Sequence, residues 1–452
     1  MAAWGCNREE SYQNLAERTR QCQIYGKMVH GTDAARKSME KRVVITGMGI
    51  VSPIGCDRET YQNNLHAGVC GVAPITRFDA AKFKTQFACE VKDFNPNDHF
   101  DRKEARRYDL FTQFALVAAE EAVNDAAFDF EKLDKERCGV IWSSGIGGVK
   151  SFFDECVGYA EGGNTPRFSP FFVPRMIIDI AAGFISMKYG LMGPNYSVVS
   201  ACASSNHAMI NAMESIRYGR ADMIITGGSD ATVNEVTIGS FNAMQALSTR
   251  NDDPAHASSP FDRNRDGFVV GEGAGALVFE ELEHAKARGA KIYCEVVGGG
   301  YSADAYHFTA PHPEGLGAIK SMREALRDAG MEPADIDYIN VHGTSTPLGD
   351  VAEIKALKGL FGEGLYDINI SSTKSMHGHL LGATGAVEAL ACVMAIQRGV
   401  VPPTINCREL DPEIDARLNL TLDQAQHREV RATLSNTFGF GGHNATIIFR
   451  KF

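Results

Sequence analysis

Cys202 is the residue of this sequence whose type and setting most favour nucleophilic chemistry. It stands in the small-residue run 200–204, after a predicted strand over 196–200 and before a predicted helix over 208–216. In open α/β sheets, functional sites gather outside the carboxyl ends of the strands. The N–H groups and partial positive charge of a helix N-terminus would lower the pKa of the thiol, and the thiolate is the nucleophilic form. The alternative is a buried structural cysteine, the commoner role of this residue.

Two histidines and a lysine follow other predicted strands in the same sense. His342 comes after a strand predicted over 338–341, and Lys374 and His379 come after one predicted over 367–371. If these strands are parallel neighbours, the side chains that follow them converge at one edge of the sheet. A single histidine is more often a packed core or surface residue. Convergence of several such groups on a helix-capping cysteine favours a catalytic site.

A glycine-rich run near the carboxyl terminus, Asn436-Thr-Phe-Gly-Phe-Gly-Gly442, is a fourth candidate. Glycines let backbone N–H groups approach a ligand closely, and Phe438 and Phe440 could cover an apolar channel. A hairpin turn with two core phenylalanines explains the same residues equally well.

Other motif-like runs fail on inspection. Gly47-Met-Gly49 follows a strand predicted over 42–46, but Ser52 replaces the third glycine of a dinucleotide fingerprint. The run 262–267 begins like a calcium loop, but Gly273 stands where the loop needs a glutamate. No group of metal-ligating residues has zinc spacing. The sequence therefore predicts neither a nucleotide cofactor nor a metal.

Strands and helices alternate along the chain. The strand 196–200, the helix 208–216 and a strand over 222–226, ended by a glycine pair, form a βαβ unit, which predicts a parallel sheet. The later half repeats this plan, with a helix that opens near Asp350 and has Glu353 as a capping-box-like partner.

Similar runs in the two parts of the chain suggest a duplication. Residues 41–49 and 291–300 each combine a basic residue, a β-rich run and a glycine turn. Residues 200–204 and 372–376 are both small-residue turns between a strand and a helix. Two similar βαβ halves are therefore expected.

The composition excludes several classes of protein. The chain has 452 residues, of which 44% are hydrophobic, enough for a large core. Its net charge of −11 argues against broad binding to nucleic acid or anionic membranes. Eleven cysteines without a CxxC pair fit reduced thiols in a cytosol-like compartment. No apolar run reaches the length of a membrane span, about 18 residues, so membrane insertion is not expected.

Residues 1–38 differ from the rest of the chain. They are polar, carry both signs of charge and lack the apolar core of a secretory signal. We expect a polar amino-terminal extension over 1–38 that is not part of the core. The fold then divides into an amino-terminal half over 39–290, which carries Cys202, and a carboxyl-terminal half over 291–452, which carries the histidines and the lysine.

Four motifs occur together, in this order and at similar separations, in one protein family: 201–205, 342–350, 372–383 and 436–442. On these motifs the chain resembles the β-ketoacyl-acyl-carrier-protein synthases of the thiolase superfamily, and among them the elongating synthase II group. The resemblance covers residues 42–452. It implies an α/β, thiolase-like five-layered αβαβα fold of two duplicated halves with mixed, mainly parallel sheets, and a homodimer.

The resemblance implies a decarboxylative Claisen condensation that elongates fatty acids by two carbons in a bacterial, cytoplasmic type II system. An acyl group moves from acyl carrier protein to Cys202, malonyl-carrier protein loses CO₂, and the carbanion equivalent attacks the thioester. His342 and His379 support the enolate oxygen, Lys374 adds positive charge, and Glu388 supplies a supporting carboxylate. No cofactor is implied beyond the phosphopantetheine arm of the carrier.

The resemblance also assigns residues around the nucleophile. The backbone N–H groups of Cys202 and Phe440 would form an oxyanion hole, and the Phe440 side chain would gate the site. Thr344 and Thr346 match positions that bind the phosphopantetheine arm. The residues expected to line the acyl pocket are Ile146, Phe241 and Phe438.

Three positions depart from the family pattern. His377 replaces a residue that is usually small or polar, Ala203 stands where threonine or serine is frequent, and His443 stands where threonine is common. None of the three removes a catalytic group. The two additional imidazoles bear on the pH profile and the acyl-length preference.

The sequence also weighs against other functions. A degradative thiolase would need a second cysteine in the run 436–442, and a type III starter synthase would have asparagine where His379 stands. A ketosynthase of a type II polyketide pathway shares the same core chemistry and stays open as an alternative. A non-catalytic thiolase-fold scaffold would have no use for the cysteine, the two histidines and the lysine together.

A small basic cluster offers a place for the carrier to dock. Carrier proteins are strongly acidic as a class, so a local basic surface must offset the negative net charge of this chain. We expect docking at a cluster of four cations: Arg102, Lys103, Arg106 and Arg107. A solvated helix face is the alternative explanation.

Overall fold

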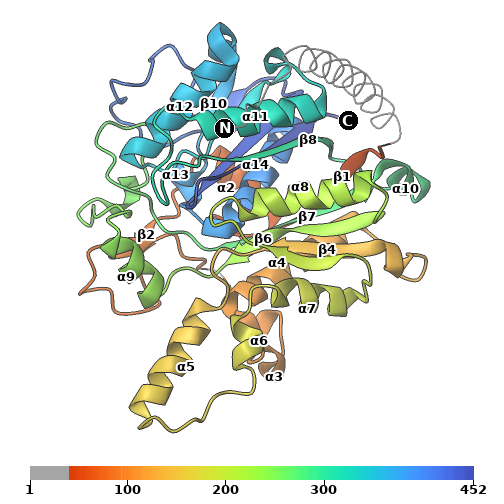
Figure 1. Cartoon of the computed structure of the whole chain (residues 1–452), viewed down its shortest axis with the longest axis vertical. Helices are drawn as coiled ribbons and strands as arrows, with labels where there is room; N and C mark the ends of the chain where they lie inside the picture. Colours follow the sequence, from red (N-terminus) through yellow and green to blue (C-terminus); the bar gives the residue numbers. More distant parts are fainter. Residues whose placement is uncertain (1–39, 93) are drawn as a thin grey trace, which may run out of the picture. The chain divides into compact units, whose positions relative to one another are not determined.

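Five strands of the amino-terminal half lie side by side in the order β5-β4-β6-β7-β1 (Figure 1). Strand β4 is parallel to β5 and β6, whereas β7 is antiparallel to β6 and β1. The computed structural model describes residues 40–92 and 94–452. The bounds of these strands are β1 (Val43–Val51), β4 (Cys138–Ser143), β5 (Asn195–Val198), β6 (Met223–Asp230) and β7 (Gly273–Glu281).

Five strands of the carboxyl-terminal half repeat this arrangement in the order β10-β9-β13-β14-β8. Strand β9 is parallel to β10 and β13, and β14 is antiparallel to β13 and β8. The equal order and equal directions confirm the expected duplication. The first strands of the two halves, β1 and β8, also pair with each other, which joins all ten strands. Their bounds are β8 (Cys294–Ala303), β9 (Tyr338–Asn340), β10 (Asn369–Ser371), β13 (Ala432–Gly439) and β14 (His443–Arg450).

The main helices form three layers around these strands. Helices α8 (Ser204–Arg217) and α14 (Thr384–Arg398) lie in the middle, because each contacts strands of both halves and they contact each other. Helices α4 (Leu110–Ala126) and α7 (Ile180–Tyr189) cover the outer face of the first half. Helix α11 (Leu316–Ala329) covers the second half and packs on α12 (Pro347–Phe361). The predicted five-layered αβαβα arrangement is confirmed.

The hydrophobic core follows these layers. One buried cluster lies around α8 and α14, a second beneath α4 and α7, and a third beneath α11 and α12. Apolar side chains on both faces of the central strands explain their nearly continuous hydrophobic runs. The middle cluster matters most for function, because both central helices begin beside the catalytic candidates.

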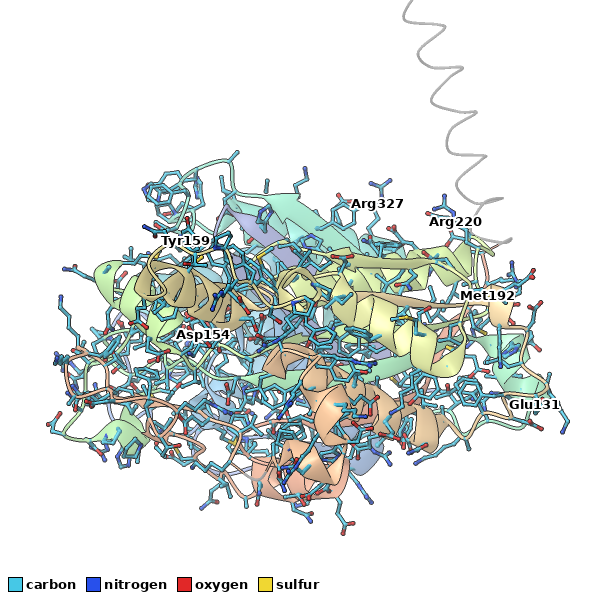
Figure 2. All side chains as sticks on the ribbon, turned by 90° about the horizontal axis from the view of Figure 1, so that it is seen from below. Glu131, Asp154, Tyr159, Met192, Arg220 and Arg327 are labelled. Carbon is cyan, nitrogen blue, oxygen red and sulfur yellow. The ribbon has the colours of Figure 1, made fainter. Side chains whose placement is uncertain are left out.

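The remaining elements connect this framework. Helices α5 and α6 form an arm that projects from it (Figure 1), and Asp154 and Tyr159 on α5 lie at the opposite end of Figure 2 from Met192. The other helices are α2 (Arg58–His66), α3 (Arg102–Ala105), α5 (Val149–Glu161), α6 (Phe172–Met176), α9 (Glu235–Ala243), α10 (Leu282–Ala287) and α13 (Lys374–His377). The short strands are β2 (Ala73–Pro74), β3 (Phe87–Ala88), β11 (Val400–Val401) and β12 (Gln426–His427). The 3₁₀ helices are Pro96–Asp98, Lys135–Arg137, Pro254–His256, Pro333–Asp335, Gly362–Asp367 and Leu381–Ala383.

Three predicted glycine turns are wrong, because these glycines lie inside strands. Strand β1 runs through Gly47 and Gly49, β6 runs through the glycine pair that was expected to end it, and β8 runs through the glycines of the run 291–300. A Cβ atom at Gly47 would lie 2.1 Å from the carbonyl oxygen of Ala122 on α4. Glycine here allows a helix to approach the strand closely and does not make a turn.

Residues 1–38, expected to form an extension, lie outside the described part of the chain. The boundary predicted near residue 290 stays a prediction. Within residues 40–92 and 94–452, no helix is both long and apolar enough to cross a membrane.

Candidate active site

Cys202 lies between β5 and the first turn of α8, as predicted. The preceding residue, Ala201, has a φ of +50°, a left-handed conformation that is uncommon for a residue with a Cβ atom. This sharp turn places Cys202 against the carboxyl-terminal half, where its side chain is 8% exposed. Cys202 also lines a cavity of about 540 Å³. The thiol is therefore buried in the protein yet open to a ligand.

The predicted lowering of the Cys202 pKa is wrong for the free protein. Burial raises the pKa of this thiol to about 12. The charge of Lys374 and hydrogen bonds from the backbone N–H groups of Phe440 and Cys202 lower the pKa, but by less. Burial disfavours the charged thiolate more than the helix terminus and these donors favour it. Cys202 is consequently a thiol at neutral pH and needs a base in order to react.

His379 is placed to act as that base. Its Nε2 atom lies 3.0 Å from the Sγ atom of Cys202, and its Nδ1 atom lies 2.9 Å from Oγ1 of Thr384. Burial, and then the charge of Lys374, hold the pKa of His379 well below its usual range, so the imidazole is neutral. A hydroxyl can either donate or accept, so Thr384 permits both tautomers of the ring. His379 can therefore accept a proton at Nε2 or donate one there.

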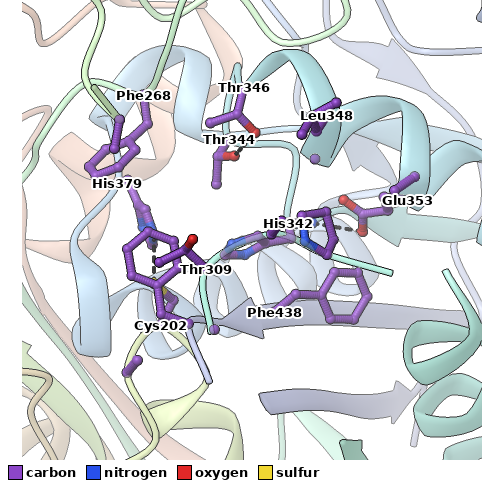
Figure 3. A pocket seen from close by; sticks show the side chains of 18 of the residues that line it. Cys202, Phe268, Thr309, His342, Thr344, Thr346, Leu348, Glu353, His379 and Phe438 are labelled. Carbon is purple, nitrogen blue, oxygen red and sulfur yellow. Dashed lines mark hydrogen bonds between the residues drawn. The ribbon is translucent and has the colours of Figure 1, made fainter. Parts of the chain in front are cut away.

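The His342 ring lies next to the His379 ring, although His342 follows β9 and His379 follows α13. Its ring centroid lies 5.3 Å from that of His379 at an interplanar angle of 87° (Figure 3). One ligating atom from each of Cys202, His342 and His379 lies within 4.8 Å of the others. Burial and the charge of Lys374 also hold the pKa of His342 well below its usual range. Two neutral imidazoles and a thiol thus share one small volume.

Glu353 positions the segment that carries His342. Its two carboxylate oxygens accept hydrogen bonds from the backbone N–H groups of His342 at 2.9 Å and Gly343 at 2.8 Å. Burial raises the pKa of Glu353 to about 7. The predicted capping box with Asp350 is wrong. Helix α12 begins earlier, at Pro347, and Asp350 instead accepts from the backbone N–H groups of Phe261 and Ser345.

Lys374 and Glu388 form a fully buried ion pair behind the cavity. Lys374 begins α13, and Glu388 lies in α14. Burial raises the pKa of Glu388 to about 7, opposed by the charge of Lys374 and the hydrogen bond from it. Neither residue lines the cavity. The pair joins α13 to α14, and the charge of Lys374 lowers the pKa of Cys202, His342 and His379.

The glycine-rich run is both a hairpin and a wall of the site. Strands β13 and β14 pair across it, and Phe438 and Phe440 line the cavity. A Cβ atom at Gly439 would lie 2.8 Å from the carbonyl oxygen of Ser200 and 3.1 Å from the backbone nitrogen of Cys202. Glycine at this position lets the hairpin touch the nucleophile's backbone. The neighbouring N–H of Phe440 can then reach the Cys202 sulfur.

The cavity brings together all five of the predicted substrate-contacting residues. Thr344 and Thr346 lie on one wall, with their hydroxyl oxygens 3.1 Å apart (Figure 3). Ile146 and Phe241 lie on another part of the lining, and Phe241 packs against Phe440 with ring centroids 6.4 Å apart. These contacts give the cavity a polar side and an apolar side.

The expectation that one sheet edge gathers the catalytic residues is only partly right. His342 and Lys374 do follow parallel neighbours, β9 and β10. Cys202 follows β5, which lies at the opposite end of the strand order from β10. The cysteine meets the histidines because α8 and α14 pack together in the middle layer. The two halves, and not adjacent strands, build the site.

Neither of the two unusual histidines, His377 and His443, lines the cavity. His377 is buried, with Nε2 2.9 Å from Oγ1 of Thr373 and Nδ1 2.9 Å from the carbonyl oxygen of Gly378. Burial lowers the pKa of His377 to about 3, so it adds no charge near neutral pH. His443 is exposed at the start of β14.

Sequence reasoning missed Glu353 and Thr384 as positioning residues. A carboxylate among buried apolar positions of one helix was a usable signal for Glu353. A threonine at the start of α14 has many ordinary roles, and only the contact with His379 identifies its function.

Comparison with known proteins agrees with this site. The β-ketoacyl synthase amino-terminal domain model matches residues 40–285, and the carboxyl-terminal domain model matches residues 293–408. A protein of Staphylococcus aureus strain COL, named 3-oxoacyl-[acyl-carrier-protein] synthase 2, is 49% identical over 92% of this chain and 99% of its own. A protein of the same name from Synechocystis is 47% identical over 91% of this chain and 99% of its own.

Solved structures share the fold. A β-ketoacyl synthase from Burkholderia phymatum superposes with a TM-score of 0.84 at 36% identity, over 91% of this chain and 100% of that one. A type II polyketide ketosynthase, solved with its acyl-carrier protein and a bound hexaketide, gives a TM-score of 0.84 at 34% identity over the same shares. The chain therefore belongs to the β-ketoacyl synthase family of thiolase-fold condensing enzymes, and it is an acyltransferase.

Proposed function

We propose that this enzyme elongates fatty acyl chains by condensing malonyl-carrier protein with an acyl group held on Cys202. The observation that carries the proposal is the placement of two neutral imidazoles and one thiol within 4.8 Å of one another in an open cavity. A thiol with a neighbouring base suits acyl transfer. Two imidazole N–H donors suit an enolate oxygen.

The first half-reaction loads the enzyme. The Cys202 thiol gives its proton to Nε2 of His379 as sulfur attacks the thioester carbonyl of the acyl carrier. Backbone N–H groups of Cys202 and Phe440 stabilise the tetrahedral oxyanion. The carbon–sulfur bond to the carrier breaks, and the carrier's thiolate takes the proton back from His379. The enzyme is left with an acyl thioester and two neutral histidines.

The second half-reaction forms the new carbon–carbon bond. Malonyl-carrier protein loses CO₂, and the electron pair of the broken bond becomes an enolate. His342 and His379 donate hydrogen bonds from Nε2 to the enolate oxygen. The enolate carbon attacks the Cys202 thioester, and the carbon–sulfur bond breaks to release a 3-oxoacyl-carrier protein. The sulfur leaves as thiolate and takes a proton that comes from solvent water, which balances the negative charge of the malonyl carboxylate lost as CO₂. Lys374 favours these anionic states through its charge, and Glu388 holds that lysine in place.

The cavity walls suggest where each part of the substrate lies. The hydroxyl groups of Thr344 and Thr346 would bind the phosphopantetheine arm. Ile146, Phe241 and Phe438 would contact the acyl chain, and the Phe440 side chain would gate the path to Cys202. The carrier's own arm is the only prosthetic group that this chemistry needs.

We infer that the carrier docks on the cluster of Arg102, Lys103, Arg106 and Arg107. All four are exposed on or beside α3, and within the described residues none of them makes an ion pair. Carrier binding is known for one solved relative, whose carrier complex supports this partner. Arg102→Glu with Arg106→Glu should raise KM for acyl-carrier protein about tenfold. The double variant Lys132→Glu with Lys286→Glu, on other exposed positions, should leave KM unchanged, and equal KM in both variants would exclude this docking site.

A second copy of the chain is the expected partner at β5. Within the described chain this strand pairs only with β4, and Tyr196 and the following Val199 are 41% and 54% exposed. An unpaired edge strand with apolar side chains favours pairing with another chain. Sedimentation should show a homodimer for the wild type and a monomer for Tyr196→Asp. A cytoplasmic location stays a prediction.

A polyketide ketosynthase is the second candidate, since the solved type II polyketide ketosynthase matches at 34% identity. The higher identity to 3-oxoacyl synthases, 47–49%, favours fatty acid elongation. Purified protein should be mixed with malonyl-carrier protein and a ladder of acyl-carrier proteins, and the products resolved by mass spectrometry. A single two-carbon extension, absent in Cys202→Ala, supports the proposal. Several successive extensions would support the polyketide function, and no product from folded protein would support a scaffold.

A further inference from the structure

We propose that Asp230 is a positioning residue that fixes the acyl-pocket wall and so sets which acyl chains the enzyme accepts. Asp230 ends β6 and is fully buried. Its carboxylate accepts hydrogen bonds from Oγ of Ser144 at 2.6 Å and from the backbone nitrogens of Gly145 and Ile146 at 2.9 and 3.3 Å. The inference rests on the proposed function, because Ile146 is taken to contact the acyl chain.

The contacts of Asp230 close a rigid turn. The hydroxyl of Ser144 donates to Asp230 and also accepts from the backbone nitrogen of Gly147 at 2.9 Å. Gly147 has a φ of +56°, and a Cβ atom there would lie 2.7 Å from the Ile178 side chain. The turn 144–147 is therefore anchored from inside by one carboxylate and packed from outside. Its two middle residues line the same cavity as Cys202.

Asp230 also reaches the segment that follows His379. The backbone N–H of Gly382 bonds the carboxylate, and a Cβ atom at Gly382 would lie only 2.2 Å from the nitrogen of Gly145. The carbonyl oxygen of Gly382 accepts a hydrogen bond from Ser205, three residues after the nucleophile. One buried side chain thus holds the pocket wall and the histidine segment in contact.

The chemistry of the carboxylate fits this role. All its donors are backbone N–H groups or a hydroxyl, and within the described residues it has no ion pair. Carboxylate oxygens can accept several hydrogen bonds at once, whereas an amide offers one oxygen and two competing donors. Asp230→Asn should therefore release the turn 144–147 while it keeps nearly the same volume. Because the turn lies at the pocket wall, the substitution should slow the reaction of a long acyl chain more than that of an acetyl group.

The test compares long and short acyl groups in Asp230→Asn. The ratio of kcat/KM for myristoyl- over acetyl-carrier protein should fall about tenfold, because a displaced wall misplaces only the chain that touches it. Asp337→Asn is the matched control: Asp337 is also buried and accepts backbone N–H groups, but it lies at the start of β9 and pairs with Arg431. The control should keep the wild-type ratio. An unchanged ratio in Asp230→Asn, or an equal loss for both substrates, would overturn the proposal.

A second readout does not depend on the proposed reaction. Alkylation of Cys202 by iodoacetamide and by its N-decyl derivative can be followed by peptide mapping, which separates Cys202 from the other free cysteines. Asp230→Asn should change the ratio of the alkylation rate with the long reagent to that with the short reagent about tenfold. If wild-type protein makes no condensation product, this ratio still tests Asp230. Should Asp230→Asn fail to fold, Ser144→Ala removes one donor and should shift both ratios in the same direction by a smaller factor; no shift there would contradict the role.

Discussion

The Nε2 atom of His379 lies 3.0 Å from the Sγ atom of Cys202, although the two residues are 177 positions apart in the chain. Burial raises the thiol pKa and lowers the imidazole pKa, so the resting pair is neutral. A neutral pair is a poor nucleophile until a thioester enters and the N–H groups of Cys202 and Phe440 stabilise the developing oxyanion. Reactivity is thereby coupled to substrate binding.

The pH dependence of alkylation tests this neutral pair. A pKa of about 12 means that the thiolate fraction of Cys202 is small and grows about tenfold per pH unit throughout the neutral and mildly alkaline range. The rate of iodoacetamide alkylation in the free enzyme should therefore rise steadily with pH and show no plateau between about pH 7 and 9. Peptide mapping isolates Cys202 from the other thiols. A plateau that begins near neutrality would instead reveal a thiolate–imidazolium pair.

Substitution of His379 and substitution of His342 should slow different half-reactions. His379→Ala removes the base beside Cys202, and acylation should slow by about 10²-fold or more. His342→Ala leaves the Cys202–His379 contact intact, so acylation should stay within about threefold, while CO₂ release from malonyl-carrier protein falls by about 10²-fold. Intact mass follows the first step, and labelled CO₂ the second. Equal losses of both steps in both variants would contradict the assignment.

Removal of only one partner of the Lys374–Glu388 pair should lower the stability of the fold. Lys374→Ala leaves a buried carboxylate without its cation, which should lower the free energy of unfolding by about 3–5 kcal/mol. The double variant Lys374→Met with Glu388→Leu removes both charges and should recover most of that stability. Neither variant should catalyse condensation, because both lack the positive charge of Lys374 near the enolate. Chemical denaturation measures the first effect; a double variant as active as wild type would show that the pair is only structural.

Gly439 should tolerate no side chain. In Gly439→Ala the new methyl group would lie 2.8 Å from the Ser200 carbonyl oxygen, so the hairpin or the nucleophile must shift. A shift of this size at reacting groups costs about 10²-fold in acylation rate. Gly158→Ala on α5 is the control, because nothing lies within 4 Å of a Cβ atom there. Acylation of Gly439→Ala at the control's rate would refute the close approach.

The sequence predicts the secondary-structure elements and the catalytic residue types better than it predicts how the two halves of the fold pack together. Helical spacing located α8, and residue types singled out Cys202, His342, Lys374 and His379. Local signals failed where tertiary packing decides: Gly47 reads as a turn but serves helix packing, and Glu353 resembles a cap but binds the His342 backbone. The thiol pKa was misjudged because burial depends on both halves of the fold.

The most direct test of the account is the mass of the enzyme itself. Incubation with acyl-carrier protein should add one acyl group to wild-type protein, and later addition of malonyl-carrier protein should remove it as a 3-oxoacyl product two carbons longer. Cys202→Ala should stay unmodified throughout. An acyl group that adds to Cys202→Ala as readily, or one that malonyl-carrier protein cannot remove from wild type, would contradict the assignment of Cys202 as the nucleophile of a condensing enzyme.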